Sequence, residues 1–178
     1  MAGRLSTALD LENKKEGTGP SPDILEGERP LDEIRDGDRL IALIIRASYQ
    51  AEGVTFFTDQ SFSQQLGYMR RPKGYVIDAH VHNKLHRDVE YTQEVLIIRK
   101  GRLRVDLYDR KCRFLTDRVL GPGDIILLAS GGHGFEMLEE VEMVEIKQGP
   151  YSPTDDKTRF KPNRGDGEPN PLMSGNCP

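Results

Sequence analysis

The feature that most constrains the fold of this chain is an alternation of apolar and polar residues with a period of two. In the stretch GRLRVDLY, Leu103, Val105 and Leu107 fall on one face of an extended chain, and mostly charged residues fall on the other. This is the period of a strand that buries one face, whereas an amphipathic helix repeats about every 3.6 residues. The pattern therefore predicts a strand.

Other stretches of the same character follow at short, regular spacing. They are RLIALIIRA (39–47), VTFFT (54–58), QQLGYMRR (64–71), YVIDAHVH (75–82), EVLIIRK (94–100), RFLTDRVL (113–120), DIILLA (124–129) and VEMVEIKQ (141–148). We expect one short helical turn in LDEIRDGDR (31–39). In Gly121-Pro122-Gly123-Asp124, Pro122 suits the second position of a type II turn, and Gly123 permits the positive φ of the third. Many short strands with few helices predict an antiparallel sandwich or barrel.

Length and composition narrow the class of protein. A chain of 178 residues is long enough for one domain with a proper core. The net charge of −4 and the lack of a basic block argue against nucleic acid or an anionic membrane as partner, so we expect a small-molecule partner or another protein. The apolar run LIALII (40–45) is far shorter than the roughly 20 residues of a membrane helix. We therefore expect a cytoplasmic protein without a membrane segment, with Cys112 and Cys177 as free thiols.

The chain divides into a core and two tails. Residues 1–23 are polar and turn-rich, so we expect a flexible N-terminal segment. Residues 24–151 contain the strand-like stretches and are expected to form the single domain. Residues 152–178 have the proline and glycine content of a loop and are expected to form an irregular C-terminal tail.

Three of the four histidines lie between residues 74 and 101, and His80 and His82 are one residue apart. On a strand, residues 80 and 82 project from the same face, about 6.5–7 Å apart along the chain. Both imidazoles can then turn into one cavity. The pair therefore predicts two ligands of a metal site, which needs at least one more.

The surrounding residues resemble the two signature motifs of the cupin family. Gly74, His80, His82, Glu94 and Gly101 resemble the first motif, and Gly121, Pro122, Gly123 and His133 resemble the second. The resemblance covers about residues 40–150 and implies an all-β fold, an antiparallel jelly-roll β-barrel with its site in the mouth. It also implies that the site holds one divalent transition metal (iron, manganese, nickel, copper or zinc) through His80, His82, Glu94 and His133.

The first motif departs from the family pattern in its spacing. Eleven residues, NKLHRDVEYTQ, separate His82 from Glu94, where cupins usually have three or four. Counting back from Gly101 selects Glu94, which begins a strand, and insertions are tolerated in loops rather than in strands. Counting forward from His82 leaves His86 or Glu90 as alternatives to Glu94. The second motif also departs, because Met137 stands where cupins often have an asparagine.

The resemblance implies a metal-dependent enzyme, of oxygenase or isomerase type, that acts on a small polar metabolite, and we expect this metabolite to be sugar-derived or anionic. Tyr91 and Glu94 are the candidate catalytic residues, and the candidate substrate-binding residues are Arg70, Tyr75, Arg99 and Phe135. One alternative is a metal-independent isomerase or epimerase of keto-sugar nucleotides, with His82 or His133 as base and a tyrosine as acid. Another is a module that binds a small ligand without turning it over. We expect a homodimer formed through the outward faces of EVLIIRK and RLIALIIRA.

Overall fold

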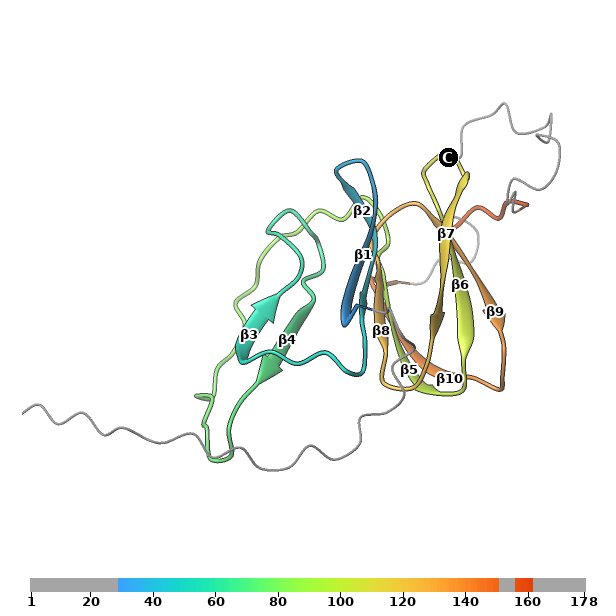
Figure 1. Cartoon of the computed structure of the whole chain (residues 1–178). Helices are drawn as coiled ribbons and strands as arrows, with labels where there is room; N and C mark the ends of the chain where they lie inside the picture. Colours follow the sequence, from blue (N-terminus) through green and yellow to red (C-terminus); the bar gives the residue numbers. More distant parts are fainter. Residues whose placement is uncertain (1–28, 151–155, 162–178) are drawn as a thin grey trace, which may run out of the picture.

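The computed structural model describes residues 29–150 and 156–161, and within these residues it contains strands and no helix (Figure 1). No described helix could therefore span a membrane. The strands are β1 (Leu31–Asp36), β2 (Arg39–Ile45), β3 (Gly53–Phe56), β4 (Gly67–Arg70), β5 (Glu94–Lys100), β6 (Leu103–Tyr108), β7 (Phe114–Leu120), β8 (Ile125–Leu128), β9 (Gly132–Met137) and β10 (Glu142–Lys147).

The strands form three antiparallel sheets. A five-stranded sheet has the order β1-β2-β8-β5-β10, a three-stranded sheet has the order β7-β6-β9, and β3 pairs only with β4. The two larger sheets face one another, and the β3–β4 hairpin projects to one side of them (Figure 1). The predicted all-β, antiparallel class is confirmed. The described residues form an open β-sandwich and not a closed barrel.

The core of the sandwich lies between the two larger sheets. In β5, β6 and β8 alternate residues point inward, as the period of two predicts, whereas in β2 the neighbours Ile41 and Ala42 both do, beside an irregularity in its pairing with β1. From the five-stranded sheet the inward residues include Ile41, Leu96, Ile98 and Ile126, and from the three-stranded sheet they include Leu103, Val105, Leu107 and Leu120. All are at most 2% exposed, so this interface is the main source of apolar burial in the fold.

The opposite face of the five-stranded sheet is also covered. Leu43, Val95 and Leu127 form a second buried cluster there, and Tyr49, Phe57, Phe62 and Leu66 pack against it. These are the outward faces of RLIALIIRA and EVLIIRK that the sequence nominated for a dimer. Because residues 49–66 of the same chain cover them, that choice of surface is wrong.

Most predicted strands are present, and the exceptions have physical reasons. The helical turn expected at 31–39 is wrong, because Gly37 has a φ of 58° and lets β1 turn back onto β2 after two residues. The strand β9 was not expected, since Gly132 and Gly134 lower its propensity, but pairing with β6 forms it. The strand predicted at 75–82 is absent, and no described strand pairs with it.

The turn predicted at 121–124 is confirmed. Gly123 has a φ of 87°, and the amide of Asp124 donates to the carbonyl of Gly121. The Asp124 carboxylate accepts hydrogen bonds from the amides of Gly121 and Ala47 and from the Arg46 guanidinium, at 2.9–3.0 Å. Arg46 also donates to the Val119 carbonyl at 2.7 Å. A buried ion pair therefore joins the end of β2 to the turn between β7 and β8.

Two further predictions concern the cysteines and the tails. Cys112 is disulfide-bonded, so the expectation of a free thiol there is wrong. Cys177, the N-terminal segment 1–23 and most of the tail 152–178 lie outside the described residues. The described part of the tail contacts the sandwich: the Phe160 ring packs edge-on against Tyr108, at 5.1 Å between centroids.

Candidate functional site

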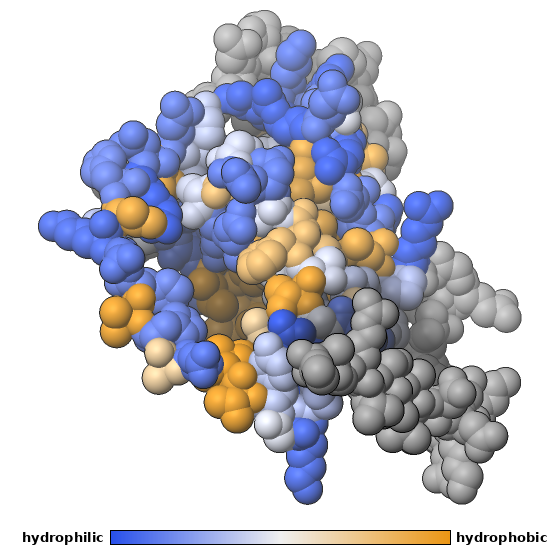
Figure 2. Space-filling model, turned by 90° about the vertical axis from the view of Figure 1, so that its left-hand side faces the viewer, coloured by the Kyte–Doolittle hydropathy of each residue, from blue (hydrophilic) through white to orange (hydrophobic). Residues whose placement is uncertain are grey.

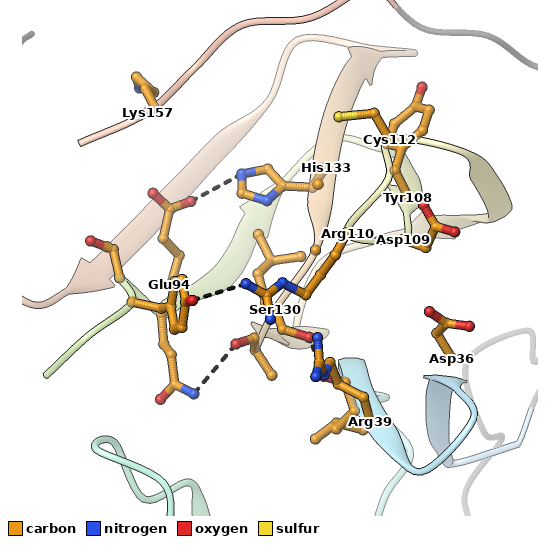
Figure 3. Close-up of a pocket in the computed structure, with 18 of the residues that line it drawn as sticks. Asp36, Arg39, Glu94, Tyr108, Asp109, Arg110, Cys112, Ser130, His133 and Lys157 are labelled. Atoms are coloured by element: carbon orange, nitrogen blue, oxygen red, sulfur yellow. Dashed lines mark hydrogen bonds and ion pairs between the residues drawn. The ribbon is translucent and has the colours of Figure 1, made fainter. Parts of the chain in front are cut away.

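A broad cleft of about 2230 Å³ opens at the end of the sandwich where β5 and β9 begin and β6 and β8 end. Its lining comes from segments far apart in the sequence: the β1–β2 turn, residues 57–63 and 88–96, the loop after β6, the residues around the start of β9, and residues 156–161. Figure 3 shows charged side chains from several of these segments around one space.

Glu94 and His133 meet in this cleft from opposite sheets. Glu94 is the first residue of β5 and lies on the same inward face as Leu96, and His133 on β9 lies on the same inward face as Phe135. The Nε2 atom of His133 is 3.3 Å from a carboxylate oxygen of Glu94, and the two side chains point toward one another (Figure 3). Both keep some exposure to the cleft, 32% for His133 and 16% for Glu94.

The surroundings of Glu94 favour its ionised form. The hydrogen bond from His133 outweighs the opposing effect of burial and, with the charges of His133 and Lys147, lowers the pKa of Glu94 from its ordinary value of 4.5 to about 2. The Lys147 ammonium is 3.5 Å from the other carboxylate oxygen and 3.6 Å from Asp156. The cleft therefore contains a carboxylate, that of Glu94, which is negative near neutral pH and is contacted by the His133 imidazole and the Lys147 ammonium.

Glycines before His133 set its position. Gly131 has a φ of 73°, and a Cβ there would lie 2.3 Å from the Tyr108 carbonyl oxygen. A Cβ on Gly132 would lie 2.9 Å from the Phe160 ring. The backbone contact excludes a side chain at Gly131, whereas at Gly132 the Phe160 ring would have to move. Gly131 therefore lets the chain enter β9 close against β6, with the imidazole of His133 directed into the cleft.

Tyr91 and Phe135 also line the cleft. The Tyr91 hydroxyl accepts a hydrogen bond of 2.9 Å from Arg110, whose guanidinium also lies over the Tyr91 ring at 5.1 Å. The Phe135 ring is 5.3 Å from the His133 ring. The structure thus gathers four of the sequence-nominated residues, Tyr91, Glu94, His133 and Phe135, at one cleft.

His80 and His82 are not part of this cleft lining. They lie close to each other, with 5.3 Å between ring centroids, within a run from residue 71 to residue 92 in which every residue is exposed. Within residues 29–150 and 156–161, no three His, Cys, Asp or Glu side chains form a group that could hold a metal ion. The proposed four ligands therefore occur as two separate pairs.

The remaining nominated residues lie at various places. Arg70 forms an exposed ion pair with Glu52 at 2.9 Å, and the Tyr75 ring lies under Arg71 at 4.8 Å. Neither Arg70, Tyr75 nor Arg99 lines the cleft. Of the alternatives to Glu94, Glu90 lines the cleft, whereas His86 has an 87% exposed side chain 3.7 Å from Asp88.

Sequence reasoning missed Lys147, Asp156 and Arg110. The period of two could have identified Lys147, because it lies opposite Glu94 in the antiparallel register and so shares its face. Asp156 accepts a hydrogen bond of 2.7 Å from Thr92 and comes from a proline-rich stretch without periodicity. Arg110 belongs to a turn. No sequence pattern indicates that either of these two residues approaches the cleft.

Compared with protein-family models, with curated proteins and with solved structures, the chain matches none of them. The resemblance to the cupins therefore depends on the motif residues alone. What the geometry defines is an open antiparallel β-sandwich with a polar cleft centred on Glu94 and His133.

Proposed function

We propose that this protein is a metal-dependent enzyme that acts on a small polar metabolite in the cleft, with Glu94 and His133 as two of its metal ligands. The observation that carries the proposal is the 3.3 Å approach of His133 to Glu94 across the sandwich. The two residues are 39 positions apart in the sequence (133 − 94), and each was selected from a different motif. The jelly-roll arrangement that the motifs imply is part of the same proposal.

The chemistry of the two donors fits a divalent transition metal. An imidazole nitrogen and a carboxylate oxygen are ligands that iron, manganese, nickel, copper and zinc all accept. The carboxylate is ionised near neutral pH, and a protonatable group and an ammonium already contact it. A bound metal would supply Lewis-acid polarisation of a carbonyl or a site for oxygen chemistry.

The chain's own residues would then bind and orient the metabolite. Arg110 holds the Tyr91 hydroxyl in place, and that hydroxyl can donate a hydrogen bond or a proton to a bound oxygen atom. Phe135, beside His133, offers an apolar surface for one face of the ligand. His80 and His82 would complete the ligand set, but they are not beside Glu94 in this conformation.

Elemental analysis of the protein, produced without a histidine tag, tests the proposal. We expect about one equivalent of metal per chain in the wild type after exposure to Co²⁺ and gel filtration, and loss of most of it in a Glu94→Gln, His133→Gln double variant. His86→Gln is the matched control and should retain the metal. A wild-type chain that binds no Co²⁺ or native metal would overturn the proposal.

A second candidate, acid–base catalysis without a metal, is favoured by one observation. His133 is already positioned by a carboxylate, and Tyr91 lies in the same cleft, which is the histidine and tyrosine pair that a metal-independent isomerase would use. Mass spectrometry of small molecules released from denatured, metal-free protein distinguishes the two. A retained nucleotide sugar would favour this candidate, and stoichiometric metal without one would oppose it.

A further inference from the structure

Both large sheets end in a strand with an open edge on the same side of the sandwich. The five-stranded sheet ends in β10 and the three-stranded sheet ends in β9, and each of these strands has one described strand partner. Residues 156–161 approach the two strands at the cleft end, where Asp156 contacts Lys147 and Phe160 lies against Gly132. Apolar side chains are exposed there: Met137 at 47%, Met143 at 38% and Ile146 at 45%. An open, apolar edge is a template for another strand.

The segment 71–92, here called the exposed segment, has the opposite property. Within it, residues 75–82 have the alternation of a strand, yet they pair with no described strand. Val76, Ile77 and Val81 are 77%, 56% and 87% exposed. Figure 2 views the molecule from the side on which β3 and β4 project and shows separate apolar groups among polar ones at this surface. Residues 75–82 thus have the pattern of a strand and backbone groups that no described strand pairs with.

The segment 75–82 and the β9 edge match in length. The eight residues 75–82 are long enough to span β9, which has six residues. Every strand pair in the fold is antiparallel. A strand added to the edge of β9 would lie about 4.8 Å from it. With His80 and His82 on its inward face, that strand would place both imidazoles beside His133 and Glu94. Val76 would share this inward face, whereas Ile77 and Val81 would lie on the outer face.

The conformation of the chain favours a second copy as the source of this strand. In Figure 1 the exposed segment runs beside β3 and β4, and β1 and β2 lie between it and the β9 edge. Residues 57–66 are held on the outer face of the five-stranded sheet, where Phe57, Phe62 and Leu66 pack. Residues 75–82 therefore lie away from the cleft of their own chain, whereas residues 88–92 return to line it, and the eleven residues after His82 can serve as a hinge.

We propose that two copies exchange residues 75–82, each adding them as an antiparallel strand to the open β9 edge of the other. Each metal site then contains His80 and His82 of one protomer with Glu94 and His133 of its partner. This inference depends on the metal-binding function proposed above and adds that the site is complete only in the dimer.

A complementation experiment tests the exchange. One variant carries His80→Gln and His82→Gln, and the other carries Glu94→Gln and His133→Gln, each with a different peptide tag that binds no metal. The two are co-expressed, and the heterodimer is purified by both tags in sequence. In exchanged dimers one of the two sites regains all four ligands, so we expect about half an equivalent of Co²⁺ per chain, and neither parent homodimer should bind appreciable Co²⁺.

The readouts are bound Co²⁺ by elemental analysis, the visible absorption of bound Co²⁺, and mass in solution by light scattering. Circular dichroism of both parents against the wild type excludes unfolding as the cause of lost metal. Two results would overturn the exchange and leave the proposed function standing. In the first, the wild type binds about one equivalent of Co²⁺ and the heterodimer binds none. In the second, the wild type binds Co²⁺ as a monomer. A wild type that binds no metal overturns both.

Discussion

The sandwich, formed by β1, β2 and β5–β10, and the exposed segment, residues 71–92, carry the same sequence pattern with different outcomes. In the sandwich, alternation leads to paired strands whose inward residues are almost fully buried. In the exposed segment it leads to no strand pair and no burial. Alternation of apolar and polar residues therefore predicts which side chains share a face of a strand. It does not predict whether that strand finds a partner strand in the fold.

The largest expected effect concerns the buried ion pair of the sandwich. Replacing Arg46 with alanine leaves the Asp124 carboxylate buried beside the β7–β8 turn without its guanidinium partner. We expect the free energy of unfolding to fall by about 3–5 kcal/mol in urea denaturation. The control is Asp88→Ala in the exposed segment, where the contact with His86 is fully open to solvent. If Arg46→Ala and Asp88→Ala lowered the free energy of unfolding equally, the sandwich and the exposed segment would not differ in how much their ion pairs contribute to stability.

A matched pair of isoleucines gives the next prediction. Ile98 in β5 is 1% exposed and Ile77 in the exposed segment is 56% exposed. Ile98→Ala should lower the free energy of unfolding by about 2–5 kcal/mol through lost burial and a cavity. Ile77→Ala should change it by less than about 0.5 kcal/mol when measured with a chelator and at a concentration where the chain is monomeric. A large effect of Ile77→Ala in the monomer would mean that the exposed segment packs on its own sandwich.

The sequence predicts the strands of the sandwich better than it predicts the residues that meet at the cleft. Inward and outward residues of β5, β6 and β8 could be assigned from the sequence because burial imposes a period of two on them. Strand β9 could not, since Gly132 and Gly134 lower its propensity and only tertiary structure reveals its pairing with β6 and the close approach of Gly131, just before it, to Tyr108. Glu94 was selected by counting from Gly101, and the structure places it beside His133. Lys147 contacts Glu94 because the antiparallel register of β10 and β5 places the two side by side. Asp156 reaches the cleft from the C-terminal tail, and Arg110 reaches it from the turn after β6.

Asp109 offers a smaller effect with a pH signature. Burial alone raises the pKa of this carboxyl, but hydrogen bonds from Arg113 and from the Lys111 amide outweigh burial and hold the pKa below the ordinary value of 3.8. A lowered pKa means that its contribution to stability is complete well above pH 3.8 and is lost as the pH falls below that value. Asp109→Asn should lower the free energy of unfolding by about 1–3 kcal/mol near neutral pH.

The measurement for Asp109 is urea denaturation between pH 6 and pH 2.5, values chosen to bracket the ordinary pKa of 3.8. The difference between wild type and Asp109→Asn should shrink toward the acid end. Asp88→Asn, an exposed carboxylate in the other region, serves as the matched change of charge. A difference that stays constant over the whole range would show that the Asp109 charge contributes nothing to the turn that contains Cys112.

The smallest expected effect concerns the two histidines themselves. His80 and His82 contact each other and His80 also contacts the Asp78 carbonyl, but no buried group depends on either. In the presence of a chelator, a His80→Ala, His82→Ala double variant should therefore unfold within about 0.5 kcal/mol of the wild type. With Co²⁺ added, only the wild type should gain stability, because a ligand that binds the folded state alone stabilises it. A loss well above 0.5 kcal/mol without metal would place these histidines in a packed environment, whereas an equal gain with metal in both proteins would remove them from the ligand set.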